Sequence, residues 1–549
     1  MDINKTQENT MSSMTGLLIL TQPVRKIIPS LSQTLKAASQ HVNKTLYIHL
    51  DPLARKRSPE LPQRLSLYSR LITTIYSESS SQCRGMDVRV LMAGFKHLAD
   101  VPQKVSSKVD LVLLDQMREE TELMDLKQRY ENYLLGNKDK LVFLCKGACS
   151  GSEELDDTVA IEDVNAAANK VFESVVVGGT FDHIHAGHKI LLAEALLRCS
   201  RKFTAGIAEG PLLKNKTLSD LIAPCQDRIE AVKELVTDLD PSLDYHIVEI
   251  TDPMGPTRWD PDMDMIVVSE ETKKGIDFIN SARKEGGLKT LEGYIISLVE
   301  DKDRKSNEEE EKVSSSSQRM RLLGTVIQPL TPNCDIPSHP HIIGLTGGSA
   351  SGKSSVAKRF QKLGAGVVDC DKLGHEAYKK STDCYNKLVQ EFGNDIVASD
   401  GEINRRALGP KVFNNKDALE KLNNIVWPEI ARLAKEQIRD LAGKGHDVVI
   451  LDAAVLLEAK WEAFCHQVWV CIIKREEAIK RIVERDGRTQ EEAERRIDNQ
   501  LSNKERVSRA NVVFCTQWAA EYTQDQVERA WEGLQTMLRE KRESNKAQL

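Results

Sequence analysis

Short apolar runs separated by polar, helix-compatible stretches recur along the whole chain. In its last third the runs lie at 341–348, 364–371, 446–452 and 467–473. In its middle third they lie at 174–182, 202–208, 245–250 and 265–270, with helical patterns at 188–200 and 226–238. Strands that alternate with helices predict parallel sheets with helices on their faces. We therefore predict two doubly wound α/β domains.

The first third shows the same alternation without a recognisable site. Its apolar runs lie at 45–50, 86–93, 109–115 and 140–145. This pattern predicts a further α/β domain. We interpret it as a structural or partner-docking domain of unknown role.

Three segments have the composition of linkers. Residues 150–165 are acidic and poor in large apolar side chains, and residues 301–317 pass from a charge run into four serines. Residues 324–340 hold four prolines, which fix φ and remove backbone donors, so they suit a semi-rigid connector. We therefore predict domains at 1–165, 166–323 and 341–549, with 324–340 as a Pro-rich linker.

Length and charge narrow the class of protein. A chain of 549 residues is long enough for three or four domains at roughly 150 residues each. Lys and Arg number 76 against 82 Asp and Glu, so no basic excess points to nucleic acid. No run reaches the roughly 18 apolar residues that a spanning helix needs. Cys145 and Cys149 are close together, but no second pair completes a zinc site, and reduced intracellular thiols are the better interpretation.

Residues 11–45 are a candidate targeting segment. From residue 15 to residue 50 the chain carries basic and hydroxyl side chains but no Asp or Glu, a bias typical of a mitochondrial presequence or a membrane-surface segment. The apolar run Leu17–Leu20 within it is short. We expect a cytoplasmic protein and leave open peripheral association with the mitochondrial membrane and protein partners for the first domain.

The clearest chemical signal is a glycine-rich loop after the apolar strand at 341–345. It matches the pattern G-x-x-x-x-G-K-[ST], and a helical stretch follows it. Its residues are Gly347, Gly348, Ser349, Ala350, Ser351, Gly352, Lys353 and Ser354, with Ser355 next in the chain. Such loops bind nucleoside triphosphates, because backbone N–H groups surround the phosphates, the lysine reaches the β- and γ-phosphates, and the hydroxyl of Ser354 can ligate Mg²⁺.

Carboxylates and arginines beyond this loop suit a kinase. Asp369 and Asp371 end the next strand, where one can act as general base, although an Asp pair that caps the following helix explains them equally. Residues 474–496 are rich in arginine. Alone they would indicate a solvated helical hairpin, but beside a phosphate loop they suit a mobile lid that neutralises the transferring phosphoryl group. The arginines in question are Arg481, Arg485, Arg488, Arg495 and Arg496.

The segments at 341–378, 400–413, 448–461 and 474–496 together resemble dephospho-coenzyme A kinases over 341 to about 540. The resemblance implies that Asp371 is the base toward a ribose 3′-hydroxyl and that Arg485 contacts the ATP phosphates. It implies substrate contacts for Arg405, and we place Asp369 on the substrate side too. Trp427 stands where the family often has histidine, so we assign no role there.

A second motif, GGTFDHIHAGH, covers residues 178–188 at a strand-to-helix junction. Histidine N–H donors at a helix N-terminus can stabilise charge on an α-phosphorus under attack, whereas few other metal-binding side chains lie nearby, which disfavours zinc. We predict that His188 is catalytic and that Thr180 offers its hydroxyl to the acceptor phosphate. ATP binding is assigned to Gly178, Gly179, Thr180, Phe181 and His185.

This motif and two later ones resemble phosphopantetheine adenylyltransferases over about 172–322. The segment 313–321 resembles the I-S-S-T-x-x-R signature, which places Ser315, Ser316 and Arg319 on the ATP phosphates; continuation of the acidic linker is the alternative. The resemblance also implies a catalytic and acceptor-binding lysine at Lys214 or, less favoured, Lys216. His185 stands where bacterial members commonly have threonine, which indicates the eukaryotic and archaeal branch.

The two resemblances in one chain match bifunctional coenzyme A synthases, in which the adenylyltransferase makes what the kinase consumes. They imply ATP, Mg²⁺, 4′-phosphopantetheine and dephospho-CoA as cofactor and substrates. Two alternatives remain: a fused nucleotidyltransferase and kinase with other small-molecule substrates, and a nucleotide-sensing scaffold whose first domain recruits partners.

Overall fold

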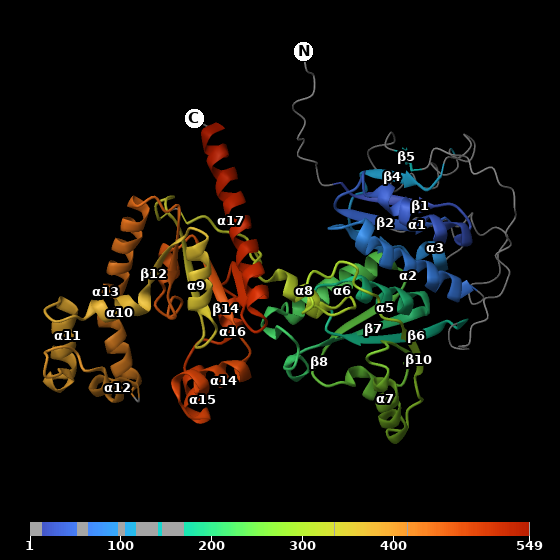
Figure 1. The fold of residues 1–549 in the computed structure, drawn as a ribbon. Helices are drawn as coiled ribbons and strands as arrows, with labels where there is room; N and C mark the ends of the chain where they lie inside the picture. Colours follow the sequence, from blue (N-terminus) through green and yellow to red (C-terminus); the bar gives the residue numbers. More distant parts are fainter. Residues whose placement is uncertain are drawn as a thin grey trace, which may run out of the picture. The chain divides into compact units, whose positions relative to one another are not determined.

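The computed structural model describes residues 14–51, 64–96, 105–116, 124, 141–144, 169–333, 335–413 and 415–547. The Cys145 and Cys149 pair and the predicted linker at 150–165 lie outside the described residues. The chain forms two compact units, a first unit at Met1–Ser317 and a second unit at Gln318–Leu549. The first unit holds two sheets and the second holds one, each with five strands (Figure 1).

The sheet of the N-terminal domain has the strand order β3-β2-β1-β4-β5, and all its pairings are parallel. Its strands are β1 (Gly16–Leu20), β2 (Thr45–Leu50), β3 (Asp87–Val90), β4 (Leu111–Leu114) and β5 (Leu141–Phe143). Its helices are α1 (Val24–Ala38), α2 (Leu65–Gln82) and α3 (Ala93–Lys96). The four predicted strands are confirmed. The central strand, β1, comes from the apolar run that the sequence had linked with targeting.

The second sheet of the first unit has the order β10-β9-β6-β7-β8, again all parallel. Its strands are β6 (Phe172–Gly179), β7 (Cys199–Ala208), β8 (Asp244–Ile250), β9 (Met265–Ser269) and β10 (Glu292–Ile296). Its helices are α5 (Ala186–Leu197), α6 (Cys225–Leu239) and α7 (Lys274–Glu285). Counted from its first strand, this order is the same as that of the N-terminal sheet, a doubly wound order.

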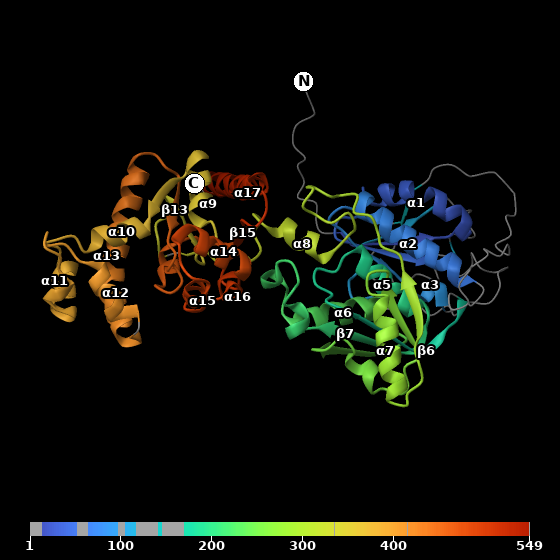
Figure 2. The same cartoon turned by 60° about the horizontal axis from the view of Figure 1, so that its bottom comes forward.

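One apolar cluster joins the two sheets of the first unit. Residues of α1 and α2 on one side and of α5 and α6 on the other belong to it, and α2 packs against α5 (Figures 1 and 2). From Ile190 to Leu197 helix α5 is buried at every residue. A helix that is apolar nearly all round is expected to be covered on more than one side. The N-terminal and middle domains therefore fold as one body.

The segment 301–317 corrects the sequence analysis. It was predicted to be a linker, but Glu300 pairs with Lys312 in an antiparallel bridge, and Glu309 and Ser317 are buried. The serines then begin helix α8 (Ser315–Leu322), which contains the boundary between the units. The linker prediction for this segment is wrong, because backbone pairing and two buried polar side chains fold it against the first unit.

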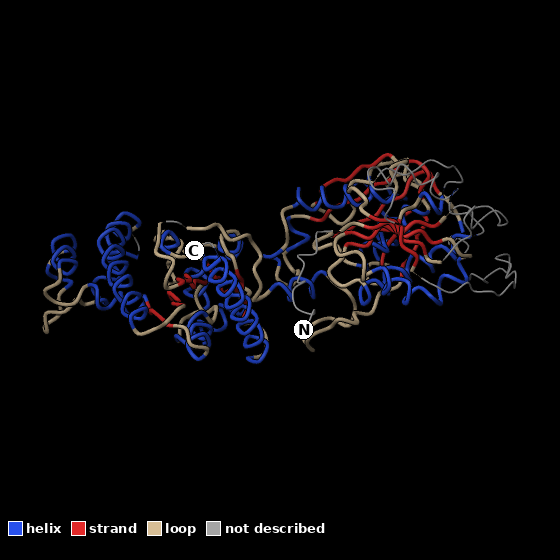
Figure 3. The backbone as a smooth tube through the Cα atoms, turned by 90° about the horizontal axis from the view of Figure 1, so that it is seen from above, coloured by secondary structure: helices blue, strands red, loops and turns tan. Residues whose placement is uncertain are grey.

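The second unit contains a parallel sheet of order β12-β13-β11-β14-β15. Its strands are β11 (His341–Gly347), β12 (Gly366–Asp369), β13 (Val448–Asp452), β14 (Gln467–Ile472) and β15 (Val512–Cys515). Its helices are α9 (Lys353–Lys362), α10 (Cys370–Ala377), α11 (Asp383–Phe392), α12 (Arg405–Phe413), α13 (Lys416–Gly443), α14 (Arg475–Asp486), α15 (Gln490–Asp498), α16 (Asn503–Val507) and α17 (Ala520–Ala547). Figure 3 shows the strands lying among helices.

The predicted α/β class is confirmed for all three domains. In the second unit, Phe360 of α9 and Val527 of α17 pack with Trp469 of β14 in one core. That core fixes α9 against the sheet directly behind the phosphate loop. Within the described part of the chain, no helix combines the length and the apolar character needed to cross a membrane.

Candidate active sites

The histidine motif lies at the turn from β6 to α5. His185 is the residue before the helix and has extended backbone angles, and His188 lies one turn further on. The two imidazole rings stack, with centroids 3.9 Å apart and an angle of 20° between their planes. Phe181 lies against His188 at 5.2 Å. The sequence prediction that these histidines form one site at a helix N-terminus agrees with this geometry.

Two buried side chains that were not predicted as site residues, Asp182 and Arg228, stabilise this turn. Asp182 is fully buried, and its carboxylate accepts a hydrogen bond of 3.1 Å from the Ala223 amide. Arg228 donates to the carbonyl oxygens of Thr180 at 2.7 Å and Ala208 at 2.9 Å, and forms an ion pair with Glu209. Sequence reasoning missed Arg228, since nothing in its own helix indicates that it reaches the ends of both β6 and β7.

The serine segment meets the histidines. The Ser315 hydroxyl lies 3.5 Å from Nε2 of His185, and the Val313 amide donates to the Val299 carbonyl at 2.8 Å. Ser316 is half-buried. Arg319 lies further along α8, beyond the unit boundary, and is 1% exposed. The structure thus brings Ser315 to the predicted site and favours the signature over a continued linker.

The two candidate lysines both lie on the surface. Lys214 ends the short 3₁₀ turn Gly210–Leu213, and both it and Lys216 are exposed. Burial lowers the pKa of Lys312, and the neighbouring charge of Lys216 lowers it further. Lys216 therefore lies near the segment that leads to Ser315, while the choice between the two lysines stays a prediction.

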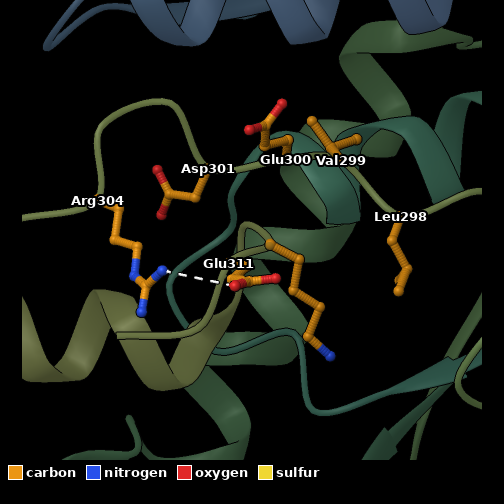
Figure 4. A pocket seen from close by; sticks show the side chains of 7 residues that line it. Leu298, Val299, Glu300, Asp301, Arg304 and Glu311 are labelled. Atoms are coloured by element: carbon orange, nitrogen blue, oxygen red, sulfur yellow. Dashed lines mark ion pairs between the residues drawn. The ribbon is translucent and has the colours of Figure 1, made fainter. Parts of the chain in front are cut away.

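A pocket of about 490 Å³ lies in the segment that precedes the serines (Figure 4). It is lined by Leu298, Val299, Glu300, Asp301, Arg304, Glu311 and Lys312. Arg304 and Glu311 face each other at 3.8 Å, and Lys312 pairs with Glu271 and Glu310. Because its two cations, Arg304 and Lys312, are already paired with carboxylates, this pocket offers no uncompensated positive charge to a phosphate.

The glycine-rich loop turns from β11 into α9. Ala350 and Gly352 have positive φ angles of 61° and 80°. A Cβ atom on Gly352 would lie 2.7 Å from Cγ2 of Thr516, so both backbone and space require glycine there. The Thr516 hydroxyl donates to the Ser351 carbonyl at 3.0 Å. Ser354 and Ser355 are exposed at the start of α9, and their hydroxyls at a helix N-terminus match a phosphate site.

Lys353 forms a buried ion pair with Asp452, the last residue of β13. Burial raises the pKa of Asp452, although the Lys353 ammonium opposes the shift. The sequence analysis did not assign Asp452. The sequence signal for Asp452 was its position at the end of an apolar run. Strand β13 is parallel to β11, so both strands end at the sheet edge where the phosphate loop begins.

The predicted carboxylates at 369 and 371 have different environments. Asp369 caps α10, because its side chain accepts a hydrogen bond from the Lys372 amide at 3.1 Å. Burial raises the pKa of Asp369, but the hydrogen bonds and charge of Lys372 outweigh it and leave the pKa lowered. Asp371 lies in the first turn of α10 and is exposed. The capping alternative therefore holds for Asp369, and the role of Asp371 as the base stays a prediction.

The arginine-rich segment forms the helical hairpin of α14 and α15. Arg485, the predicted lid residue, pairs with its neighbour Asp486 at 2.7 Å. Two other arginines reach the phosphate loop: Nε of Arg496 donates to the Ser349 hydroxyl at 3.1 Å, and Arg481 contacts the Ala350 carbonyl at 3.4 Å. Arg481 and Arg496 are therefore the arginines that touch the loop in this conformation.

Arg405 lies at the start of α12. Its guanidinium is 3.0 Å from Nε2 of His375 on α10 and lies over the Tyr378 ring at 5.6 Å. Burial and the charge of Arg405 lower the pKa of His375. This contact places the Arg405 cation against the helix that carries Asp371, while its substrate role stays a prediction.

The oxygen donors of the second unit fit Mg²⁺. Among the described residues no group of three His, Cys, Asp or Glu side chains could hold a metal by itself. Mg²⁺ binds through one or two protein oxygens together with substrate phosphates. The Ser354 hydroxyl and the Asp452 carboxylate, at the phosphate edge of the sheet, have the right chemistry.

Comparison with known proteins identifies the second unit. The model of the family described as dephospho-CoA kinase matches residues 341–519. A dephospho-CoA kinase of Carboxydothermus hydrogenoformans is 37% identical over 186 residues, which make up 34% of this chain and 90% of that protein. The chain belongs to the dephospho-CoA kinase family. A second such kinase, from Geobacter sulfurreducens, is 37% identical over 191 residues, 35% of this chain and 97% of that protein.

Two further family models match parts of the chain before the kinase domain. The cytidylyltransferase-like model covers residues 176–321, and the model described as the COASY N-terminal domain covers 14–136. Among solved structures, a dephospho-CoA kinase from Campylobacter jejuni is 23% identical and covers 35% of this chain and 96% of its own, with a TM-score of 0.29. The three families in this order are the domain set of a bifunctional coenzyme A synthase. The comparisons favour an enzyme with kinase and nucleotidyltransferase activities over the scaffold alternative.

Proposed function

We propose that the chain performs the last two steps of coenzyme A synthesis. The first unit transfers the adenylyl group of ATP to 4′-phosphopantetheine, giving dephospho-CoA and pyrophosphate. The second unit transfers the γ-phosphoryl group of another ATP to the ribose 3′-hydroxyl, giving CoA and ADP. The observation that carries the proposal is the presence of both phosphate-binding turns in one chain, after β6 and after β11, in domains of matching families.

In the first reaction a phosphate oxygen of the acceptor attacks the α-phosphorus in line, and the bond to pyrophosphate breaks. No side chain forms a covalent bond. His188 and Lys214, or Lys216 in its place, stabilise the charge that develops at the α-phosphorus. Thr180 positions the acceptor phosphate. The stacking of His185 on His188 and the approach of Ser315 to His185 support a shared role in binding the triphosphate.

In the second reaction the 3′-hydroxyl attacks the γ-phosphorus, and Asp371 takes its proton. When ATP binds, the Lys353 ammonium moves from Asp452 to the β- and γ-phosphates. The buried ion pair supports this step, because it holds the ammonium at the loop before ATP arrives. Arg485 releases Asp486 to neutralise the transferring group, while Arg496 stays on the loop. When bound, Mg²⁺ supplies charge neutralisation between the phosphates, with Ser354 and Asp452 as the residues that would hold it.

The test is to supply purified protein with 4′-phosphopantetheine, ATP and Mg²⁺ and to follow dephospho-CoA and CoA by mass spectrometry. The wild type is expected to form CoA through dephospho-CoA. His188→Ala is expected to lose the first step and Lys353→Ala the second, so each variant is the other's control. A protein that converts neither 4′-phosphopantetheine nor supplied dephospho-CoA would refute the pathway and leave two nucleotide sites of other specificity.

Peripheral association with the mitochondrial membrane and protein partners of the N-terminal domain also remain proposals. They rest on the acid-free composition of residues 15–50 and on the N-terminal domain's lack of a recognisable site. Flotation with vesicles rich in anionic lipid tests the first, with vesicles of neutral lipid as control. Absence of the protein from the anionic vesicle fraction would contradict it.

A further inference from the structure

The residue directly after His188 connects the adenylyltransferase site to the N-terminal domain. Lys189 lies in the first turn of α5. Its ammonium donates to the Asp87 carboxylate at 2.5 Å and to the Val88 carbonyl at 2.9 Å, both on β3. The Lys189 side chain is 13% exposed. The N-terminal domain therefore contacts the helix turn that carries the two stacked histidines.

Asp87 is part of a larger network between the two domains. Arg89 donates to Asp87 at 2.7 Å and to Asp238 of α6 at 2.6 Å. The Tyr47 hydroxyl donates to the same Asp238 carboxylate at 2.8 Å. Burial raises the pKa of Asp87, but the charges of Lys189 and Arg89 outweigh it, so the pKa is lowered and Asp87 stays ionised.

The far end of α5 is also held by the N-terminal domain. Glu194 accepts a hydrogen bond from the Ser69 hydroxyl of α2 at 2.7 Å and pairs with Arg198 at 2.5 Å. Arg198 in turn donates to the Ser69 hydroxyl at 2.9 Å. Glu194 and Arg198 are 2% and 0% exposed. Polar contacts with the N-terminal domain thus fix helix α5 at both ends, in addition to the apolar cluster that the two domains share.

We propose that the N-terminal domain is a positioning domain for adenylyl transfer: Asp87 and the Val88 carbonyl hold Lys189, and thereby fix the first turn of α5 so that His185 and His188 face the triphosphate. Lys189 and Asp87 are positioning residues and touch no substrate. Displacement of a catalytic group by about 1 Å can lower a rate about 100-fold. The inference rests on the proposed function of this site.

The experiment compares Asp87→Ala and Lys189→Ala with a control variant, Lys96→Ala, which removes a different contact between the same two domains. Lys96 pairs with Asp240 at 2.6 Å and donates to the Cys199 carbonyl, and the Lys96 and Asp240 side chains are 5% and 1% exposed. Lys96→Ala therefore removes an interface contact at least as buried, beside the end of α6 and the start of β7. The full chain is used, since its kinase step, in the second unit, is an internal control for protein concentration, and Lys96→Ala controls for damage to the first unit.

Asp87→Ala and Lys189→Ala are expected to lower kcat for dephospho-CoA formation about 10- to 100-fold, with KM changing less than threefold and the kinase step unchanged. Lys189→Arg should restore most of the rate, because the longer cation can still reach Asp87. Lys96→Ala should keep adenylyl transfer within threefold of wild type. A structural effect alone would lower the rate in all three alanine variants alike.

A second readout does not depend on substrate identity. Hydrogen exchange of the amides at 186–190 should accelerate in Asp87→Ala and Lys189→Ala but not in Lys96→Ala. Unchanged exchange and a rate within threefold of wild type in both variants would overturn the proposal, as would an equal loss in Lys96→Ala. A wild-type protein that makes no dephospho-CoA would instead refute the proposed function, and the exchange result would still decide whether the N-terminal domain holds the first turn of α5.

Discussion

Removal of the Lys353 side chain leaves Asp452 buried without its cation. The two side chains are 9% and 5% exposed. Breaking a buried pair in this way costs about 3–5 kcal/mol. For a unit of this size the expected fall in Tm is on the order of 10 °C. Because burial raises the folded-state pKa of Asp452, the cost is largest above that pKa and shrinks as the pH falls and the carboxyl is protonated.

The double variant Lys353→Ala/Asp452→Ala separates stability from catalysis. It removes both charges, so it should be more stable than Lys353→Ala by about 1–3 kcal/mol, the cost of a buried polar group that is left without a partner. Neither variant should phosphorylate dephospho-CoA, because the ammonium that reaches the phosphates is absent from both. Adenylyl transfer in the first unit should stay at the wild-type rate.

Tryptophan fluorescence during urea unfolding measures this effect in the intact chain. Five of the six tryptophans lie between residues 427 and 531, in the second unit, and the remaining one, Trp259, is exposed. The signal therefore reports mainly on the kinase domain. If Lys353→Ala unfolds at the wild-type urea concentration, or the double variant is less stable than the single one, the buried pair does not support this fold and the reasoning fails.

Three further predictions concern the lid, pH and metal. Arg485→Ala should lower the kinase kcat about 10-fold or more without a change in Tm, since the Arg485 side chain is 59% exposed and its ion pair with Asp486 lies at the surface; an unchanged kcat would move the lid role to Arg496. Because the folded pKa of Asp87 is lowered, its contribution to stability is present above the usual value of 3.8 and is lost as the pH falls through the folded pKa. The difference in Tm between wild type and Asp87→Asn should therefore vanish in that acid range. Removal of Mg²⁺ with EDTA should stop both reactions, and recovery on adding Mg²⁺ but not Na⁺ is the control.

The sequence alone predicted the chemistry at both turns. An apolar run, a glycine-rich stretch and a helix-forming stretch are local features, and they determine a strand, a tight turn and a helix N-terminus in that order. The loop from Gly347 to Ser354 and the turn from Gly178 to His188 therefore lie where the pattern put them. The α/β class followed from the same alternation.

Short elements and the packing of polar segments were harder to predict. Strands β10 and β15 were missed, because runs of five and four residues carry little periodicity. The run Leu17–Leu20 was associated with targeting, yet it is the buried central strand of the N-terminal sheet. The charged segment 301–317 was interpreted as a linker, since its composition does not reveal that its backbone pairs with itself.

What only the tertiary structure decided is which distant side chains support each site. Asp452 lies 99 residues from Lys353, Thr516 lies 165 residues from Ser351, and Asp87 lies 102 residues from Lys189. The sequence determined the two phosphate-binding turns, because their conformation depends on neighbours in the chain. The strand order and the packing of two domains around α5 bring the distant partner residues to these turns. Both depend on the burial of apolar side chains across the whole fold, which no local pattern reveals.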